Sequence, residues 1–120
     1  MLNLDTHVVL NAMTGQLRST EIRLLSADQW GISDIVLWEI GKLGQLGRIE
    51  IDLDDADVAR FLGALQVWPI TLDICRAMRG LDFRSDLADE IIAATSIVHR
   101  APLLTRDRVI RRSKLVPLAG

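Results

Sequence analysis

Short apolar runs alternate along the chain with longer segments in which apolar residues recur every three or four positions. The short runs have the length of buried strands, and the longer segments have the spacing of amphipathic helices. Because parallel strands need long connections, this alternation predicts a parallel sheet with crossover helices. We expect one three-layer α/β/α domain over residues 1–120, with a central parallel sheet of four to five strands. The expected strands are residues 1–4, 30–33, 67–70 and 101–105, with an edge strand at 114–118.

Helices are expected between these strands, and polar residues mark several of their starts. A Ser, Thr or Asp side chain before a helix can accept a hydrogen bond from a free amide of the first turn. On this basis we expect caps at Ser33, Thr71 and Asp86, and at Ser19 or Thr20. The expected helices are residues 6–13, 19–25, 34–46, 54–66, 72–78, 87–100 and 106–112.

The composition is that of an ordinary globular domain, with 49% hydrophobic and 25% charged residues. No run of about 18 apolar residues is present, and the N-terminus lacks the pattern of a secretory signal, so no membrane association is expected. The single cysteine, Cys75, allows no internal disulfide and fits a reducing cytoplasm. We expect its side chain to be buried as a small apolar group.

The net charge of −2 conceals an uneven distribution of charge. Residues 1–75 contain 5 Lys or Arg and 11 Asp or Glu, whereas residues 76–120 contain 9 and 5. This division is compatible with a cation site beside a track for a polyanion, and equally with two solvated faces.

Two carboxylates fall directly after predicted strands. Asp5 follows the first strand, and Asp107 lies just beyond the strand at 101–105. Ligands of open parallel sheets bind at the carboxyl ends of the strands. An ionised carboxylate among apolar neighbours is also costly unless it has a partner. The sequence therefore predicts chemistry at this edge of the sheet.

Two further acids interrupt the apolar faces of predicted helices. Glu39 lies on the same helical face as Ile35, Val36 and Leu43, and Asp89 precedes buried-side residues in the first turn of its helix. Each acid alone has a structural explanation. Asp5 or Asp107 can cap the helix that follows it, and Asp89 can serve the helix dipole only. Glu39 can pair with a buried arginine or extend outward to solvent.

The coincidence of four such acids favours a divalent cation. Carboxylates that lie together repel one another, and a cation relieves that repulsion. Oxygen donors without cysteine or histidine partners predict Mg²⁺ (or Mn²⁺), and His7 and His99 form no transition-metal pattern. Such an ion can polarise a phosphodiester and activate water for attack. Basic residues flank Asp107 where a phosphate backbone would run, and those expected to contact RNA are Arg106, Arg108, Arg111 and Arg112.

Three stretches of the chain resemble PIN domains of the VapC toxin type, from bacterial toxin–antitoxin pairs. They are "LDTHVVL", "ISDIVLWEIGKL" and "DLADEIIAATSIVHRAPLLTRDRVI", in that order. The resemblance covers essentially all 120 residues. It implies that Asp5, Glu39, Asp89 and Asp107 are catalytic metal ligands, and that Thr6, Ser33 and Thr105 support them.

The resemblance also implies a function. Members of this family are Mg²⁺- or Mn²⁺-dependent endoribonucleases that often act on tRNA or ribosomal RNA, are inhibited by a cognate VapB-like antitoxin, and often form homodimers. One departure is Glu90, which stands where the family often has a basic residue and adds negative charge beside the expected site. Asp86 is a further acid near that site.

The residues around Asp5 disfavour two other enzyme classes. An aspartyl phosphatase of the haloacid dehalogenase type would need a second aspartate at position 7, which is His7, and a receiver domain would need an acid pair before Asp5. A non-catalytic module that binds a partner protein or RNA is the remaining alternative. The three tryptophans, at positions 30, 38 and 68, are better explained as core residues than as partner contacts.

Overall fold

The computed structural model describes all 120 residues and contains one parallel sheet of four strands. The order across the sheet is β3–β2–β1–β4, so the first strand lies inside it. Register pairs Leu2 with Trp30 and Asn3 with Leu103. The strands are β1 (Leu2–Leu4), β2 (Trp30–Ser33), β3 (Gln66–Trp68) and β4 (Leu103–Leu104).

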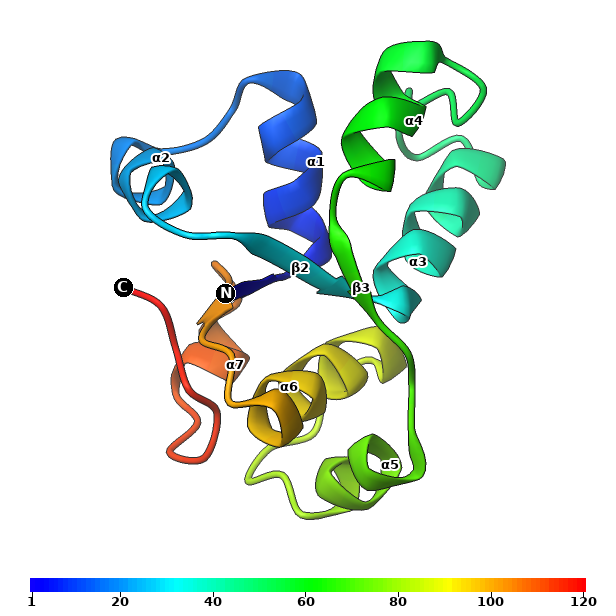
Figure 1. The fold of residues 1–120 in the computed structure, drawn as a ribbon. Coiled ribbons are helices and arrows are strands. Elements are labelled where there is room, and N and C mark those ends of the chain that lie inside the picture. Colours follow the sequence, from blue (N-terminus) through cyan, green and yellow to red (C-terminus); the bar gives the residue numbers. More distant parts are fainter.

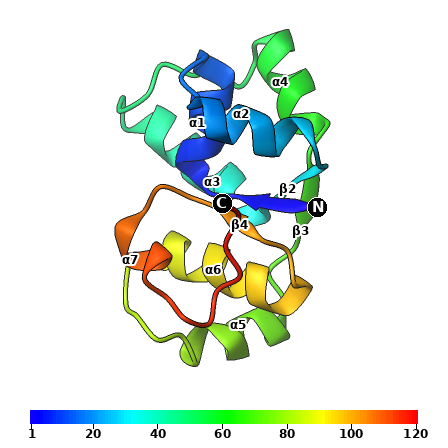
Figure 2. The same cartoon turned by 90° about the vertical axis from the view of Figure 1, so that its left-hand side faces the viewer.

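Helices cover both faces of this sheet, which confirms the predicted three-layer α/β/α architecture. In Figure 1 the first four helices lie above the sheet and the last three below it, and Figure 2 shows the same layers from the side. None of these helices is both long and apolar enough to span a bilayer. The helices are α1 (Thr6–Thr14), α2 (Ser19–Ser26), α3 (Asp34–Gln45), α4 (Ala56–Gly63), α5 (Leu72–Arg79), α6 (Leu87–His99) and α7 (Arg108–Arg111).

The core lies on both sides of the two central strands. Leu4 and Ile32 are fully buried, as are Val9 on the upper side and Ile92 on the lower side. Burying one such side chain contributes about 1.5–3 kcal/mol, so the sheet and its flanking helices hold the strand ends in fixed positions. Asp5 and Asp107, which follow β1 and β4, are therefore attached to a rigid part of the fold.

The expected fifth strand does not form. Residues 114–118 contact the sheet through a single bridge, between Leu103 and Leu118. Pro117 lies in this segment and has no backbone N–H to donate, although its carbonyl accepts from the amide of Leu103 at 2.8 Å. The sheet therefore has four strands.

The predicted helix caps are confirmed at two positions and wrong at two. Ser33 and Thr71 accept hydrogen bonds from the amides of the helices they precede. Helix α2 instead starts after Arg18, whose amide donates to Glu21, so neither Ser19 nor Thr20 caps it.

Asp86 occupies the cap position of α6, but its side chain makes no capping hydrogen bond. Glu90 reaches back to the amide of Ser85 at 2.8 Å and fastens the start of the helix in its place. The side chain of Asp86 is left exposed to solvent.

Two further expectations about burial are wrong. Cys75 lies on α5 and is exposed, because the helix buries Ile74 and turns its neighbour toward solvent. Trp38 on α3 is 58% exposed and is not a core residue. Trp30 and Trp68 are half-buried.

A polar side chain inside the core leads to a stability prediction. Asn3 is fully buried in β1 and donates to the carbonyl of Ile92 at 3.0 Å and to the hydroxyl of Ser96 at 2.9 Å. Asn3→Ala removes both bonds and leaves a small cavity, so we expect the free energy of unfolding to fall by about 2–3 kcal/mol in urea denaturation. The half-buried Asn11 makes no hydrogen bond through its side chain, so Asn11→Ala is the matched control. Equal losses in the two variants would contradict a structural role for the Asn3 bonds.

Candidate active site

Asp5 joins β1 to α1 and is held by two hydrogen bonds. Its side chain is almost wholly buried, with the residue 3% exposed. Oδ1 accepts from the amide of Thr6 at 2.8 Å, and Oδ2 accepts from the hydroxyl of Thr105 at 2.5 Å. Burial raises the pKa of Asp5, and the two hydrogen bonds oppose that rise. Asp5 is thus the cap of α1 and also a fixed, costly carboxylate at the strand end.

Thr105 connects Asp5 to Asp107. Its hydroxyl donates to Asp5 and accepts from the amide of Asp107 at 3.0 Å, so the orientation of the hydroxyl is determined. Oδ1 of Asp107 accepts from two amides at the start of α7, which makes Asp107 the cap of that helix. Its other oxygen makes no hydrogen bond within the chain.

Asp5 and Asp107 open into a common hollow. The hollow has a volume of about 270 Å³ and no apolar side chain in its wall. The other wall residues are His7, Asn11 and Arg106. It is a polar depression at the carboxyl ends of β1 and β4, where the sequence predicts chemistry.

Asp89 approaches the same edge of the sheet from α6. Its Oδ2 accepts from the hydroxyl of Ser85 at 2.9 Å. Burial raises the pKa of Asp89 to about 6, the Ser85 hydrogen bond opposes the rise, and the charges of the other three acids add to it. Those acids are Asp5, Asp107 and Glu39. The other three predicted acids therefore lie within electrostatic reach of Asp89, and Asp5 and Asp107 lie within reach of each other.

Glu39 contributes the fourth carboxylate from α3. It is half-buried beside the fully packed Ile40, and it forms neither an ion pair nor a hydrogen bond. The alternative that Glu39 pairs with a buried arginine is therefore wrong. Because Glu39 is partly exposed, the other alternative, a side chain that extends outward to solvent, stays open.

The three predicted supporting hydroxyls occupy different situations. Thr105 alone touches a carboxylate side chain. Ser33 accepts from the amide of Ile35 at 3.3 Å as the cap of α3. The hydroxyl of Thr6 is buried and has no hydrogen-bond partner. Thr105 is thus the only one of the three hydroxyls that makes a direct hydrogen bond to a carboxylate of the site.

The chemistry of the donors fits a hard divalent cation. Each acid offers oxygen, and the raised pKa of Asp5 and of Asp89 reflects negative charge that burial makes costly and a cation would relieve. No three His, Cys, Asp or Glu side chains lie close enough together to form a closed metal centre. The fit therefore rests on donor type and electrostatics.

The raised pKa of Asp89 predicts a stability change in metal-free protein. Because the folded pKa of about 6 exceeds the ordinary 3.8, ionisation favours unfolding, and stability is lost as the pH rises through this window. In EDTA at neutral pH, Asp89→Asn should raise the free energy of unfolding by about 1–2 kcal/mol, after allowance for solvent screening. The gain should disappear below about pH 4, where the carboxyl is protonated in both states. Asp54→Asn, at an exposed loop acid, is the control, and a gain that persists in acid would contradict the assignment.

The four predicted RNA-contacting arginines divide into two pairs. Arg106 forms a two-pronged ion pair with the buried Glu21, at 2.6 and 2.8 Å. Arg111 donates to the carbonyls of Thr105 and Gly120. The remaining two, Arg108 and Arg112, are exposed and have no partner within the chain.

The sequence reasoning missed several residues beside the site. Asn11 shares the hollow with His7, and their four-residue spacing on a helix was an available signal. Ser85 binds Asp89 from the loop before α6, and only its proximity in the chain pointed to it. Glu90, which was expected to add negative charge beside the site, accepts a hydrogen bond from the amide of Ser85.

The sequence matches the PIN domain family over residues 3–114. The chain belongs to the PIN domain family. The membership predicted from the three motifs is confirmed, and with it the fold that brings the ends of β1, β4, α3 and α6 together. Among curated proteins, none matches the chain significantly.

Solved structures of similar fold come from bacteria. VapBC2 from Rickettsia felis, bound to a DNA fragment from its promoter, superposes with a TM-score of 0.77 at 19% identity, over 99% of this chain and 98% of that one. FitAcB from Neisseria gonorrhoeae gives 0.70 at 20%, over 100% and 97%. A toxin–antitoxin complex from Klebsiella pneumoniae gives 0.67 at 23%, over 89% and 87%. At these identities the likeness of this PIN domain to them concerns the fold.

Proposed function

We propose that this PIN domain is a metal-dependent endoribonuclease and the VapC-like toxin of a toxin–antitoxin pair. The observation that carries the proposal is the placement of three acids, Asp5, Asp107 and Glu39, within electrostatic reach of Asp89, whose pKa is raised by burial and by these three charges. Membership of the PIN domain family and the toxin–antitoxin complexes among its structural neighbours support the same function.

The four acids have distinct places in this proposal. Asp5, Glu39, Asp89 and Asp107 would hold Mg²⁺ or Mn²⁺. When bound, the ion would supply a Lewis acid that polarises the phosphodiester and makes water a better nucleophile. Hydrolysis of RNA in this manner leaves a 5′-phosphate and a 3′-hydroxyl.

The chain itself supplies orientation. Thr105 holds Oδ2 of Asp5 and leaves Oδ1 on the amide of Thr6, so the carboxylate cannot rotate without losing a bond. Ser85 holds one oxygen of Asp89 in the same way. Fixed carboxylates would lose little freedom on binding a divalent cation, and that preorganisation is a source of rate.

Positive charge beside the acids supports an RNA substrate. Arg108 begins α7 directly after Asp107, and Arg112 follows the end of that helix; both are exposed and form no ion pair within the chain. Exposed arginines of this kind contact phosphates without reading sequence. The choice of tRNA or ribosomal RNA as substrate rests on the resemblance to VapC proteins.

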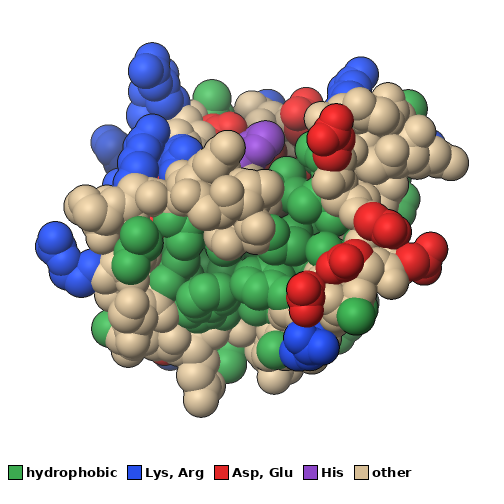
Figure 3. All heavy atoms as spheres, turned by 90° about the horizontal axis from the view of Figure 1, so that it is seen from above, with side chains coloured by type: hydrophobic (Ala, Val, Ile, Leu, Met, Phe, Trp, Pro, Cys, Tyr) green, Lys and Arg blue, Asp and Glu red, His purple; other side chains and the backbone are tan.

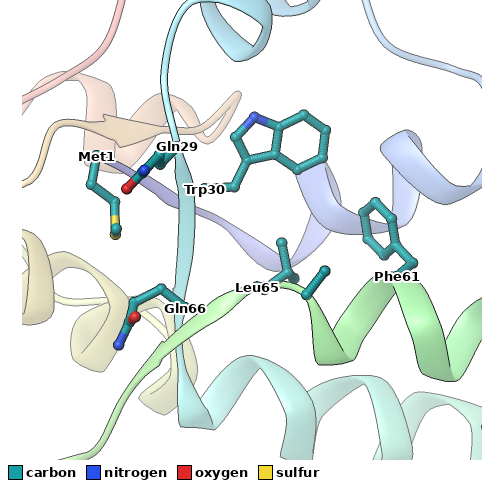
Figure 4. Close-up of a pocket in the computed structure, with 7 residues that line it drawn as sticks. Met1, Gln29, Trp30, Phe61, Leu65 and Gln66 are labelled. Atoms are coloured by element: carbon teal, nitrogen blue, oxygen red, sulfur yellow. The ribbon is translucent and has the colours of Figure 1, made fainter.

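Open apolar surface supports a protein partner, which we propose to be a VapB-like antitoxin. Figure 3 shows a broad apolar area, with acidic side chains along its right side. Figure 4 shows Trp30 of β2 and Phe61 of α4 beside a common hollow, which has a volume of about 540 Å³. This hollow shares no wall residue with the one that Asp5 and Asp107 line. Phe61 also lines a smaller hollow with Met13 and Val58, so apolar surface continues over α4.

A homodimer is part of the same proposal. Three large apolar side chains on α3, α5 and α6 are more than half exposed. They are Trp38 at 58%, Leu72 at 64% and Leu87 at 62%. Helices α3 and α5 each pack against α6, and we propose that these three side chains contribute to the interface between two copies of the chain.

The non-catalytic alternative shares these apolar surfaces and differs in the acids. A pure binding module has no need for Asp89 with a pKa raised to about 6, because this feature costs stability at neutral pH. Purified protein, freed of antitoxin, should cleave total RNA in Mn²⁺ or Mg²⁺ and stop in EDTA. Intact RNA under every condition, together with no binding of Mn²⁺, would favour the binding module.

A further inference from the structure

Arg106 lies beside the carboxylates of the site but forms its ion pair with another acid. The residue lines the hollow into which Asp5 and Asp107 open, the carboxylate hollow, and directly precedes Asp107 in the chain. Its guanidinium nevertheless bonds to α2. Nε and Nη2 donate to the two carboxylate oxygens of Glu21, at 2.8 and 2.6 Å, and this is the only ion pair that Arg106 forms.

Glu21 is fixed in position by its own surroundings. It lies in the first turn of α2 and is 5% exposed. Its Oε1 also accepts from the backbone amide of Arg18 at 2.7 Å, so the carboxylate has a set orientation. Nη2 of Arg106 donates in addition to the carbonyl of Gln16 at 3.1 Å. The two side chains therefore form a firm contact between α2 and the loop that joins β4 to α7.

Without Glu21, the acceptor left to Arg106 lies in the carboxylate hollow. Arg106 borders that hollow and a second one between α2 and α7, and Asp5 and Asp107 are the only other acidic side chains in their walls. Gly120 also faces the second hollow, but its oxygen is already bound by another arginine at 2.8 Å. Both oxygens of Asp5 accept hydrogen bonds, whereas one oxygen of Asp107 makes none within the chain. A guanidinium pairs readily with such a carboxylate oxygen.

We infer that Glu21 is a positioning residue of the site: by binding the guanidinium of Arg106, it keeps this cation off Asp107 and leaves the carboxylates open to a metal ion. The inference rests on the proposed function in taking Mg²⁺ or Mn²⁺ as the ion. Glu21 does not line the carboxylate hollow, so it acts through Arg106 and not by contact with the ion. A guanidinium released into the hollow would compete with the metal for the same oxygen.

A crystal structure of metal-free Glu21→Gln tests the position of the guanidinium without metal or RNA. Glutamine keeps the size of the side chain and can still accept from the amide of Arg18, but it removes the charge that binds Arg106. Because a carboxylate is a stronger acceptor than a neutral amide, we expect the guanidinium to leave residue 21 and bond to the free oxygen of Asp107. A guanidinium that stays beside residue 21, or extends into solvent, would overturn the inference whether or not the protein cleaves RNA.

Titration with Mn²⁺ measures the consequence for the site. Loss of a group that orients a metal site lowers metal affinity by about 10–100-fold, so we expect Glu21→Gln to bind Mn²⁺ at least about tenfold more weakly than the unchanged protein. Removal of the competing guanidinium, in Glu21→Gln/Arg106→Gln, should restore most of the lost affinity. If the pair had a structural role alone, the double variant would bind Mn²⁺ no better than Glu21→Gln, and the inference would be overturned.

Arg106→Gln alone separates this competition from a simple effect of charge. Through-space effects of the two charges would add, so Arg106→Gln would then bind Mn²⁺ more tightly than the unchanged protein, by the factor that Glu21→Gln loses. We expect no such gain, because a guanidinium held by Glu21 does not compete for the site. All proteins are compared at a temperature where circular dichroism shows them folded. Movement of Arg106 onto Asp107 in a protein that binds no Mn²⁺ would uphold the positioning role of Glu21 and leave the metal-dependent nuclease to fail alone.

Discussion

Asp5→Asn is expected to abolish RNA cleavage in Mn²⁺ while leaving the protein folded. Loss of a group that merely supports a metal ligand costs about 10–100-fold, so loss of a central carboxylate should cost at least about 100-fold. Asparagine keeps the shape of the side chain and can still accept from the amide of Thr6. Because burial raises the pKa of Asp5, removal of its charge should not weaken the fold.

The control for this experiment is Asp54→Asn, which removes the same charge from an exposed loop. It should cleave as well as the unchanged protein. Far-ultraviolet circular dichroism and the unfolding midpoint report whether each variant is folded. Cleavage that survives in Asp5→Asn would mean that the site is wrongly assigned or that the preparation contains another nuclease.

Arg106→Ala is expected to cause the largest loss of stability. Glu21 is 5% exposed, and Arg106 is its only charged partner. Removal of the guanidinium strands a buried carboxylate, so we expect the free energy of unfolding to fall by about 3 kcal/mol at neutral pH. The hydrogen bonds from Arg106 lower the pKa of Glu21 from its ordinary 4.5, so the stability they confer is present above that pH and is lost in acid. The difference in the free energy of unfolding between the unchanged protein and Arg106→Ala should therefore narrow below about pH 4.

Arg60→Ala provides a matched comparison for the ion pair. Arg60 and Asp57 lie 2.9 Å apart with side chains 76% and 87% exposed. Such a pair is worth about 0–1 kcal/mol, so its loss should hardly move the urea midpoint. If Arg106→Ala were as mild as Arg60→Ala, the pair with Glu21 would have no structural importance.

Much of the architecture follows from local patterns in the sequence. The strand at residues 30–33 and the helix capped by Ser33 form as expected, because the signals involve neighbouring residues. Asp5 and Asp107 were expected at one edge because parallel strands end together, and both line one hollow.

The features that could not be predicted depend on contacts between distant residues. Arg106 was assigned to RNA, yet its partner Glu21 lies 85 positions away and no local pattern indicates the pair. Asp86 was expected to cap α6, but the competing reach of Glu90 to Ser85 is settled only by side-chain geometry. Exposure of Cys75 depends on how α5 rotates against α6, which a single amphipathic pattern did not determine.

The most direct test of the central claim is a titration of metal-free protein with Mn²⁺, followed by the electron paramagnetic resonance signal of the free ion. The account predicts saturable binding at a small whole number of sites, lost in Asp5→Asn and retained in Asp54→Asn. The same binding should raise the thermal unfolding midpoint of the unchanged protein and of Asp54→Asn, and should leave that of Asp5→Asn unchanged. Equal binding by all three proteins, or none by any, would contradict the claim that these four acids form a metal site.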